Sequence, residues 1–145
     1  MAKSFLNSDH MDRKILAFVW FGFFVINGAI ILFLRLQDWI GRDYFFSALK
    51  QWNVSYAPYI GAITLFYWSS GKKKALGKSN KNKTAFYLAL ACSVIWNVLI
   101  FIFLMQPLTG SGFIEDAMKN IEDIVFMLSW LVAGAMGYYF ANSAR

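Results

Sequence analysis

The sequence predicts an all-α, polytopic membrane protein with four transmembrane helices, and three observations support this. First, 59% of the 145 residues are hydrophobic and only 15% are charged, whereas a soluble domain has about 25% charged residues. Second, the apolar residues are gathered in four segments. Third, lysines are concentrated between the second and third segments, where basic residues orient a chain in a membrane. The length indicates a single domain over residues 1–145.

The first two apolar segments differ in how clearly they predict a span. Ile15–Leu34 has no charged residue, and as a helix it is about 30 Å long, which matches the hydrocarbon core. We therefore place the first span at 15–35. Ala57–Ser70 is too short by itself, so we extend this span back to Trp52 and place it at 52–70. Pro58 then lies in its first turns, where the missing N–H matters least; a re-entrant segment is the alternative.

The stretch between these two spans, Leu36–Tyr56, mixes aromatic and charged residues. This composition is typical of a helix that lies in the membrane interface with its aromatic side chains among the headgroups. Asp38 and Arg42 are four residues apart and would pair on one face of such a helix. We therefore predict an interfacial helix between the first two spans.

The second half of the chain contains two more spans. Thr84–Met105 has no charged residue, and we place the third span at 84–106. Helical periodicity then continues from about Phe113 to Phe140 and predicts one extended last helix. Its amphipathic first turns would lie outside the membrane, and its span would cover 121–141.

Basic residues predict the orientation of the chain. The N-terminal tail, the central loop 71–83 and the C-terminus hold ten of the fourteen Lys and Arg residues, and the other connections hold four. By the positive-inside rule, both termini and the loop are cytoplasmic, and we expect a bacterial inner-membrane location. The loop has six lysines and no acid: Lys72, Lys73, Lys74, Lys78, Lys81 and Lys83.

Three interpretations of this basic loop stay open. It could only set the topology, it could bind anionic membrane lipids, which attract each lysine by about 1 kcal/mol, or it could dock a soluble cytoplasmic protein. Direct nucleic-acid binding is not expected, because no aromatic residues are interleaved with the lysines.

Small or polar residues recur at every fourth position in the third and fourth spans, a pattern that lets helices pack closely in lipid. One strip would pack the third helix on the fourth, and the other would then meet a neighbouring copy. We therefore expect a homo-oligomer, with a tetramer as the preferred size. The strips are Ala85, Ala89, Ser93 and Asn97, and Ser129, Ala133, Gly137 and Ala141.

The sequence offers little catalytic chemistry. His10 and Cys92 are the only His and Cys, and the spans contain no acid in their interior, so the usual catalytic and metal sites cannot be built. We expect no enzymatic activity, no catalytic or metal-binding residue and no cofactor. Proton-coupled antiport of the small multidrug resistance type is disfavoured as well, because that chemistry needs an embedded glutamate.

Two further polar features have alternative interpretations. Asn27 is the one strongly polar residue in the first span, and we expect it to bond with another helix; contact with a substrate or ion is the alternative. An outer acidic cluster, Glu115, Asp116, Glu122 and Asp123, could concentrate cations at the mouth of an oligomer. It could also simply favour the helix macrodipole and stay solvated.

In its architecture of four spans and basic cytoplasmic loops, the chain resembles the small membrane subunits of bacterial antiphage defence systems, such as the Kiwa system. The resemblance implies a subunit that oligomerises, senses perturbation of the envelope and works with a cytoplasmic partner that binds nucleic acid. The leading hypothesis is therefore a non-enzymatic membrane subunit that self-associates and presents the basic loop to a soluble partner. The alternative is an oligomeric ion channel or pore.

Overall fold

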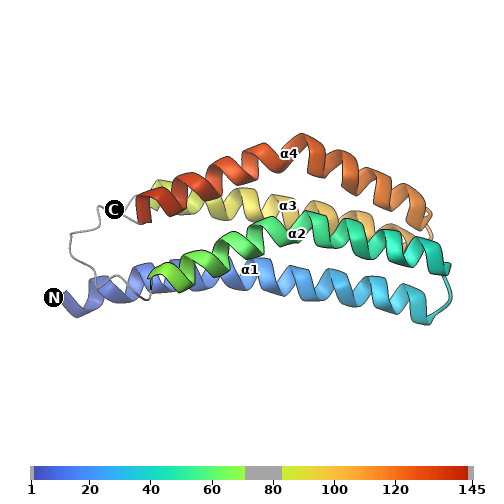
Figure 1. Ribbon diagram of the computed structural model, residues 1–145, viewed down its shortest axis with the longest axis horizontal. Helices are drawn as coiled ribbons and strands as arrows, with labels where there is room; N and C mark the ends of the chain where they lie inside the picture. The colour runs from blue at the N-terminus through green and yellow to red at the C-terminus, as the bar shows by residue number, and fades with distance from the viewer. Residues whose placement is uncertain (1, 71–82, 144–145) are drawn as a thin grey trace.

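The computed structural model describes residues 2–70 and 83–143, and the side chains of residues 11–66 and 83–141. The elements in these ranges are four α-helices: α1 (Ala2–Leu36), α2 (Arg42–Ser70), α3 (Lys83–Thr109) and α4 (Ile114–Ser143). They lie side by side as an elongated bundle, in which each helix runs opposite to the one before it (Figure 1).

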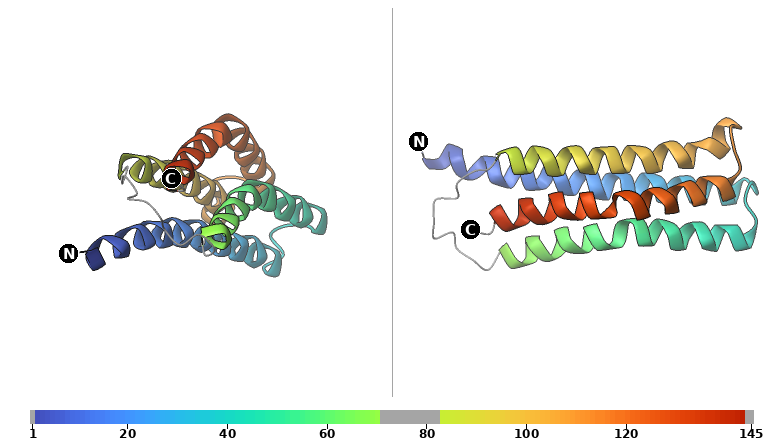
Figure 2. Two further views of the ribbon diagram at one scale, coloured as in Figure 1. Left: turned by 60° about the vertical axis from the view of Figure 1, so that its left-hand side comes forward. Right: turned by 90° about the horizontal axis from the view of Figure 1, so that it is seen from above.

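The helices form a ring in which each packs against two others. α1 packs on α2 and α3, and α4 packs on α3 and α2, so the parallel helices α1 and α3 are neighbours (Figure 2). Ala2, Ser70, Lys83 and Ser143 all lie at one end of the bundle, here called the loop end (Figure 1). The opposite end, the turn end, holds the connections 37–41 and 110–113.

Both connections at the turn end begin with the same helix-ending motif. At α1, Trp39 N donates to Leu34 O and Asp38 N donates to Arg35 O, while Asp38 has a left-handed φ of 53°. At α3, Ser111 N donates to Gln106 O and Gly110 N to Pro107 O, with a φ of 70° at Gly110. These are Schellman motifs, which satisfy the last carbonyls of a helix.

The expected pairing of Asp38 with Arg42 is wrong. Asp38 lies in the turn rather than on a helix, and its carboxylate accepts a hydrogen bond from Arg35 at 2.8 Å. The Arg42 guanidinium instead lies over the ring of Phe46, 5.9 Å from its centroid. The left-handed turn at Asp38 brings the carboxylate back over the end of α1, which explains why the partner comes before Asp38 in the chain and not after it.

The separate interfacial helix expected over Leu36–Tyr56 is not present. Leu36 ends α1, and residues from Arg42 onward form the first half of α2, which continues without a break to Ser70. The polar stretch has the periodicity of a helix with one buried face: Ala48 and Tyr56 are buried in the bundle, and Lys50 is exposed. The same continuity argues against a re-entrant segment.

Pro58 consequently lies deep inside α2 and not in its first turns. A proline there removes the hydrogen bond to the carbonyl of Val54, four residues earlier. Pro58 is exposed, so its ring does not displace a neighbouring helix, and the turns on either side keep the helix intact.

Three of the four helices are long and apolar enough to cross a membrane, namely Met11–Leu36, Lys83–Thr109 and Ile114–Ala141. The chain is therefore an integral membrane protein built as a helical bundle. α4 is a single extended helix with bounds close to the predicted Phe113–Phe140. α1 begins at Ala2, well before the predicted span, because no Gly or Pro interrupts the polar tail before Gly22.

Candidate functional site

The centre of the bundle holds a layer of aromatic and polar side chains, here called the polar layer: Trp20, Asn27, Tyr56, Tyr59, Ser93, Trp96 and Asn97. Trp20 is fully buried, and its indole N–H donates to Ser93 Oγ at 2.9 Å. Its ring stacks on Tyr59 with 4.5 Å between centroids and meets Tyr56 edge-on at 5.9 Å. A single tryptophan of α1 thus contacts α2 and α3 together.

The remaining contacts of the polar layer join all four helices. Asn27 is fully buried and donates through Nδ2 to the Tyr56 hydroxyl at 2.6 Å. It therefore bonds across helices, from α1 to α2. The Tyr59 hydroxyl donates to the backbone carbonyl of Ser129 on α4 at 3.1 Å, and the Tyr59 ring meets Trp96 at 5.4 Å.

Three buried polar atoms of the layer have no hydrogen-bond partner within the described part of the chain: Asn27 Oδ1, Asn97 Oδ1 and Trp96 Nε1. The Asn97 amide nitrogen is satisfied, because it donates to Ser93 O at 2.7 Å. Leaving a buried polar group unpaired costs about 1–3 kcal/mol. The three unpaired atoms therefore lower the stability of the bundle. Apolar side chains at the same positions would not carry this cost.

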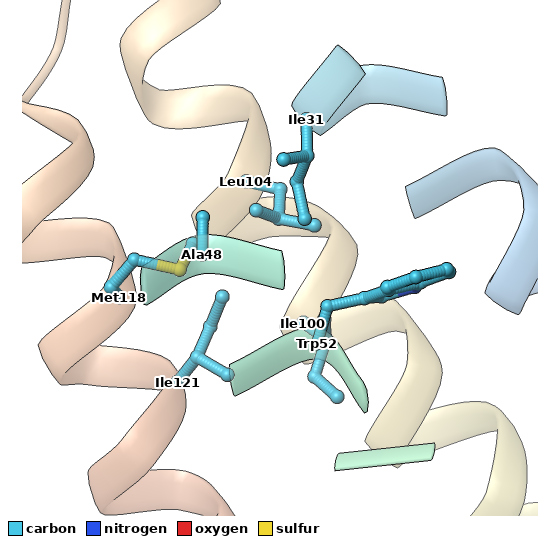
Figure 3. Close-up of a pocket in the computed structure, with 7 residues that line it drawn as sticks. All are labelled: Ile31, Ala48, Trp52, Ile100, Leu104, Met118 and Ile121. Carbon is cyan, nitrogen blue, oxygen red and sulfur yellow. The ribbon is translucent and has the colours of Figure 1, made fainter. Parts of the chain in front are cut away.

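A small cavity lies on the turn-end side of the polar layer, because its lining residues come after Asn27 on α1 and before Tyr56 on α2. Figure 3 shows these lining residues. Its volume is about 10 Å³, which is close to the minimum needed by one water molecule. All four helices contribute to its wall, which consists of Ile31, Ala48, Trp52, Ile100, Leu104, Met118 and Ile121. Because this wall offers no polar partner and no larger space, the cavity is a packing defect and not a ligand site.

The Trp52 side chain of α2 lies close to the backbone of α1 beside this cavity, at Gly28. The Trp52 indole N–H donates to the backbone carbonyl of Phe24 at 3.1 Å, and its ring stacks on Phe24 at 4.2 Å. A Cβ at Gly28 would lie 2.7 Å from Trp52 Cζ2. Only a glycine at this position therefore leaves room for the Trp52 indole to lie flat against α1.

The two strips of small residues lie in different environments. Ala85, Ala89, Ser93 and Asn97 are all buried, where α3 packs on α1 and α4. In the second strip, Ser129 is half-buried, and Ala133, Gly137 and Ala141 are exposed. A Cβ at Gly137 would meet nothing within 4 Å, so the packing of one chain does not explain a glycine there.

Of the two charged groups predicted from the sequence, the structure describes the acidic one in full and only one residue of the basic one. Lys72, Lys73, Lys74, Lys78 and Lys81 fall outside the described residues, and Lys83 is exposed at the start of α3. Glu115, Asp116, Glu122 and Asp123 are exposed along the first turns of α4, at the turn end. Glu115 lies near the Tyr44 hydroxyl of α2, and interaction with this carboxylate raises the pKa of the tyrosine.

Sequence reasoning named Asn27, Ser93 and Asn97 but missed the aromatic members of the polar layer. Trp and Tyr in a membrane protein are commonly interfacial anchors, so nothing in the composition separates a central Trp20 from a peripheral Trp130. The available signal was the spacing of Tyr56 and Tyr59, three residues apart on one helix face.

Comparison with known proteins adds no family. No protein-family model matches the chain, and neither the curated proteins nor the solved structures provide a similar one. Within the described residues, no group of three or more His, Cys, Asp or Glu side chains is placed to hold a metal ion.

Proposed function

We propose that this chain is a non-enzymatic membrane subunit that self-associates, anchors in and senses the membrane, and presents residues 71–83 to a soluble cytoplasmic partner. The observation that carries the proposal is the common position of four helix ends. Ser70 and Lys83, which flank the loop, lie at the same end of the bundle as Ala2 and Ser143 (Figure 1). The described helix ends next to the basic tail, loop and C-terminus therefore lie together at this end.

The direction of the helices supports α2 as the fourth span. α1 and α3 run parallel (Figure 2), and both are long and apolar enough to cross a membrane. If both cross in the same direction, the chain must return between them, and α2 is the element that does so. Its polar groups are compatible with this role, since Ser55 Oγ donates to Gln51 O and Thr64 Oγ1 to Ile60 O within the helix.

Four spans place both termini and the basic loop on the cytoplasmic side of a bacterial inner membrane, in agreement with the positive-inside rule. Reporter fusions at Asn80 and Arg145 should both score cytoplasmic, and a fusion at Ser111 should score external. Replacing the six loop lysines with glutamine should weaken this bias, because the charge difference across the membrane falls. An external signal at Asn80 would contradict the four-span topology.

Docking of a partner by the loop predicts a charge-dependent interaction. Lys72→Glu, Lys73→Glu and Lys74→Glu together should remove co-purifying cytoplasmic proteins from a mild-detergent pull-down read by mass spectrometry. Expression and oligomer mass should stay unchanged. Binding to the wild type should also weaken with salt, because the Debye length falls from about 10 Å at 0.1 M to about 3 Å at 1 M. A matched variant with the three lysines changed to arginine keeps the charge and should retain binding.

The resemblance to Kiwa-type membrane subunits suggests that this partner acts in antiphage defence. A gene for a soluble effector adjacent to the gene of this chain would support that setting. The alternative function, an oligomeric pore, requires a lumen between copies. A single bundle offers none, because side chains of the polar layer fill its described centre. The cavity beside that layer has a volume of only about 10 Å³.

A further inference from the structure

The two sides of the bundle differ in polarity at one level. The cavity fixes this level, because its wall joins Ile31 of α1, Ala48 of α2, Ile100 of α3 and Ile121 of α4. On the α1 and α3 side, the neighbouring exposed residues are apolar: Leu32 is 51% exposed, Phe33 47% and Ile102 51%. Side chains of this kind are typical of contact with lipid tails.

At the same level, α2 and α4 expose charged and amide groups beside apolar ones such as Val54 and Phe126. Lys50 and Asn53 of α2 are exposed, as are Lys119, Glu122 and Asp123 of α4. Within the described residues, no salt bridge joins Lys50, Lys119, Glu122 or Asp123 to another side chain of the bundle. We call these five residues, with the helix surfaces that carry them, the α2/α4 face.

The α2/α4 face lies at the level of these exposed apolar residues of α1 and α3. Lys50 comes eight residues after the start of α2 at Arg42, and Glu122 eight residues after the start of α4 at Ile114. Both are therefore about 12 Å from the turn end along their helices. A lysine can extend its amine toward the surface, but Glu122 and Asp123 are too short to do so. Contact of an unpaired charged group with lipid tails is unfavourable.

We propose that the α2/α4 face is covered by a second copy of this chain, with Lys50 and Lys119 of one copy against Glu122 and Asp123 of its neighbour. The inference rests on the self-association proposed above and assigns its surface. The patch is self-complementary, because it holds both signs of charge on adjacent helices, as an interface between identical chains requires.

The small-residue strip of α4 continues this face toward the loop end. Ala133 lies eleven residues after Glu122, which is three helical turns and brings it to the same side of the helix. Ala133 and Gly137 are exposed, and the space beside Gly137 is open to at least 4 Å. A neighbouring helix can therefore approach α4 closely on the loop-end side of the charged groups. Such close packing stabilises association in lipid.

Charge exchange tests the interface. Oligomer mass is measured by native mass spectrometry in nanodiscs for the wild type, Lys50→Glu, the double variant Glu122→Lys with Asp123→Lys, and the triple variant that combines them. We expect Lys50→Glu and the double variant each to weaken self-association by about tenfold or more, and the triple variant to restore it. Asp116→Lys, an exposed acid in the first turn of α4, is the control and should change little.

Three outcomes would overturn the inference. A wild-type oligomer whose mass is unchanged by Lys50→Glu and by the double variant would place the interface elsewhere and leave self-association standing. A monomeric wild type would refute both proposals. In a Cys92→Ala background, Asn53→Cys should react slowly with a membrane-impermeant maleimide, because a neighbouring copy covers it. Reaction at the rate of a free thiol would show that water, and not a second copy, covers the α2/α4 face.

Discussion

Trp20→Ala should lower the free energy of unfolding by about 3–5 kcal/mol, the range for removing a large buried aromatic side chain. The side chain is fully buried and contacts three residues on two other helices. Its N–H donates a hydrogen bond to Ser93, and its ring stacks on Tyr59 and makes an edge contact with Tyr56. Alanine leaves a cavity between α1, α2 and α3 that these three residues cannot close without moving their helices.

The measurement is the loss of helical circular dichroism during titration with SDS in mixed micelles. Trp130→Ala is the matched control, because Trp130 is 71% exposed, and its unfolding free energy should change by no more than about 0.5 kcal/mol. Trp20→Phe should fall between the two, since it keeps most of the ring but cannot donate to Ser93. Equal stability of Trp20→Ala and Trp130→Ala would contradict the central position of Trp20.

Gly28→Leu should separate α1 from α2 and lower stability by about 1–3 kcal/mol or more, the range for overpacked cores. Even the first added carbon would lie 2.7 Å from the Trp52 ring. This indole cannot rotate away easily, because it is bonded to Phe24 O and stacked on the Phe24 ring.

Gly22→Leu is the control for this position. Gly22 lies on the same helix, but a Cβ there would meet nothing within 4 Å, so leucine should be tolerated and should raise helix propensity slightly. The same SDS titration compares the two variants, and Trp52→Ala in the Gly28→Leu background should recover part of the lost stability. If Gly28→Leu were as stable as Gly22→Leu, the close contact of α1 with α2 would be refuted.

The polar layer and the α2/α4 face suggest different roles for polarity in this bundle. Asn27, Tyr56 and Ser93 are enclosed and tie the helices of one chain together. Lys50 and Glu122 are exposed and have a partner only if another copy supplies it. Variants at the first group should therefore change the stability of the chain, whereas variants at the second should change the mass of the assembly.

The sequence by itself determined the helical class and three strongly apolar helices, the last of which is extended. Spans are predictable because backbone hydrogen bonds must close within a segment in lipid, so apolar length alone indicates a helix. The sequence also indicated that Asn27 needs a partner and that two helices carry small strips. It misjudged residues 36–56, because an interfacial helix and the polar half of a longer helix have the same composition.

Only the tertiary structure decided which polar and aromatic residues face inward. Trp20 and Trp130 are alike in sequence terms, yet one is the centre of the polar layer and the other is exposed, because the direction of a side chain depends on where the neighbouring helices lie. The ring order of α1, α2, α4 and α3 likewise placed the small strip of α3 inside and left that of α4 outside. It also brought Lys50 and Glu122 to the same level of two adjacent helices, although they are far apart in the chain, because α2 and α4 are neighbours only after folding.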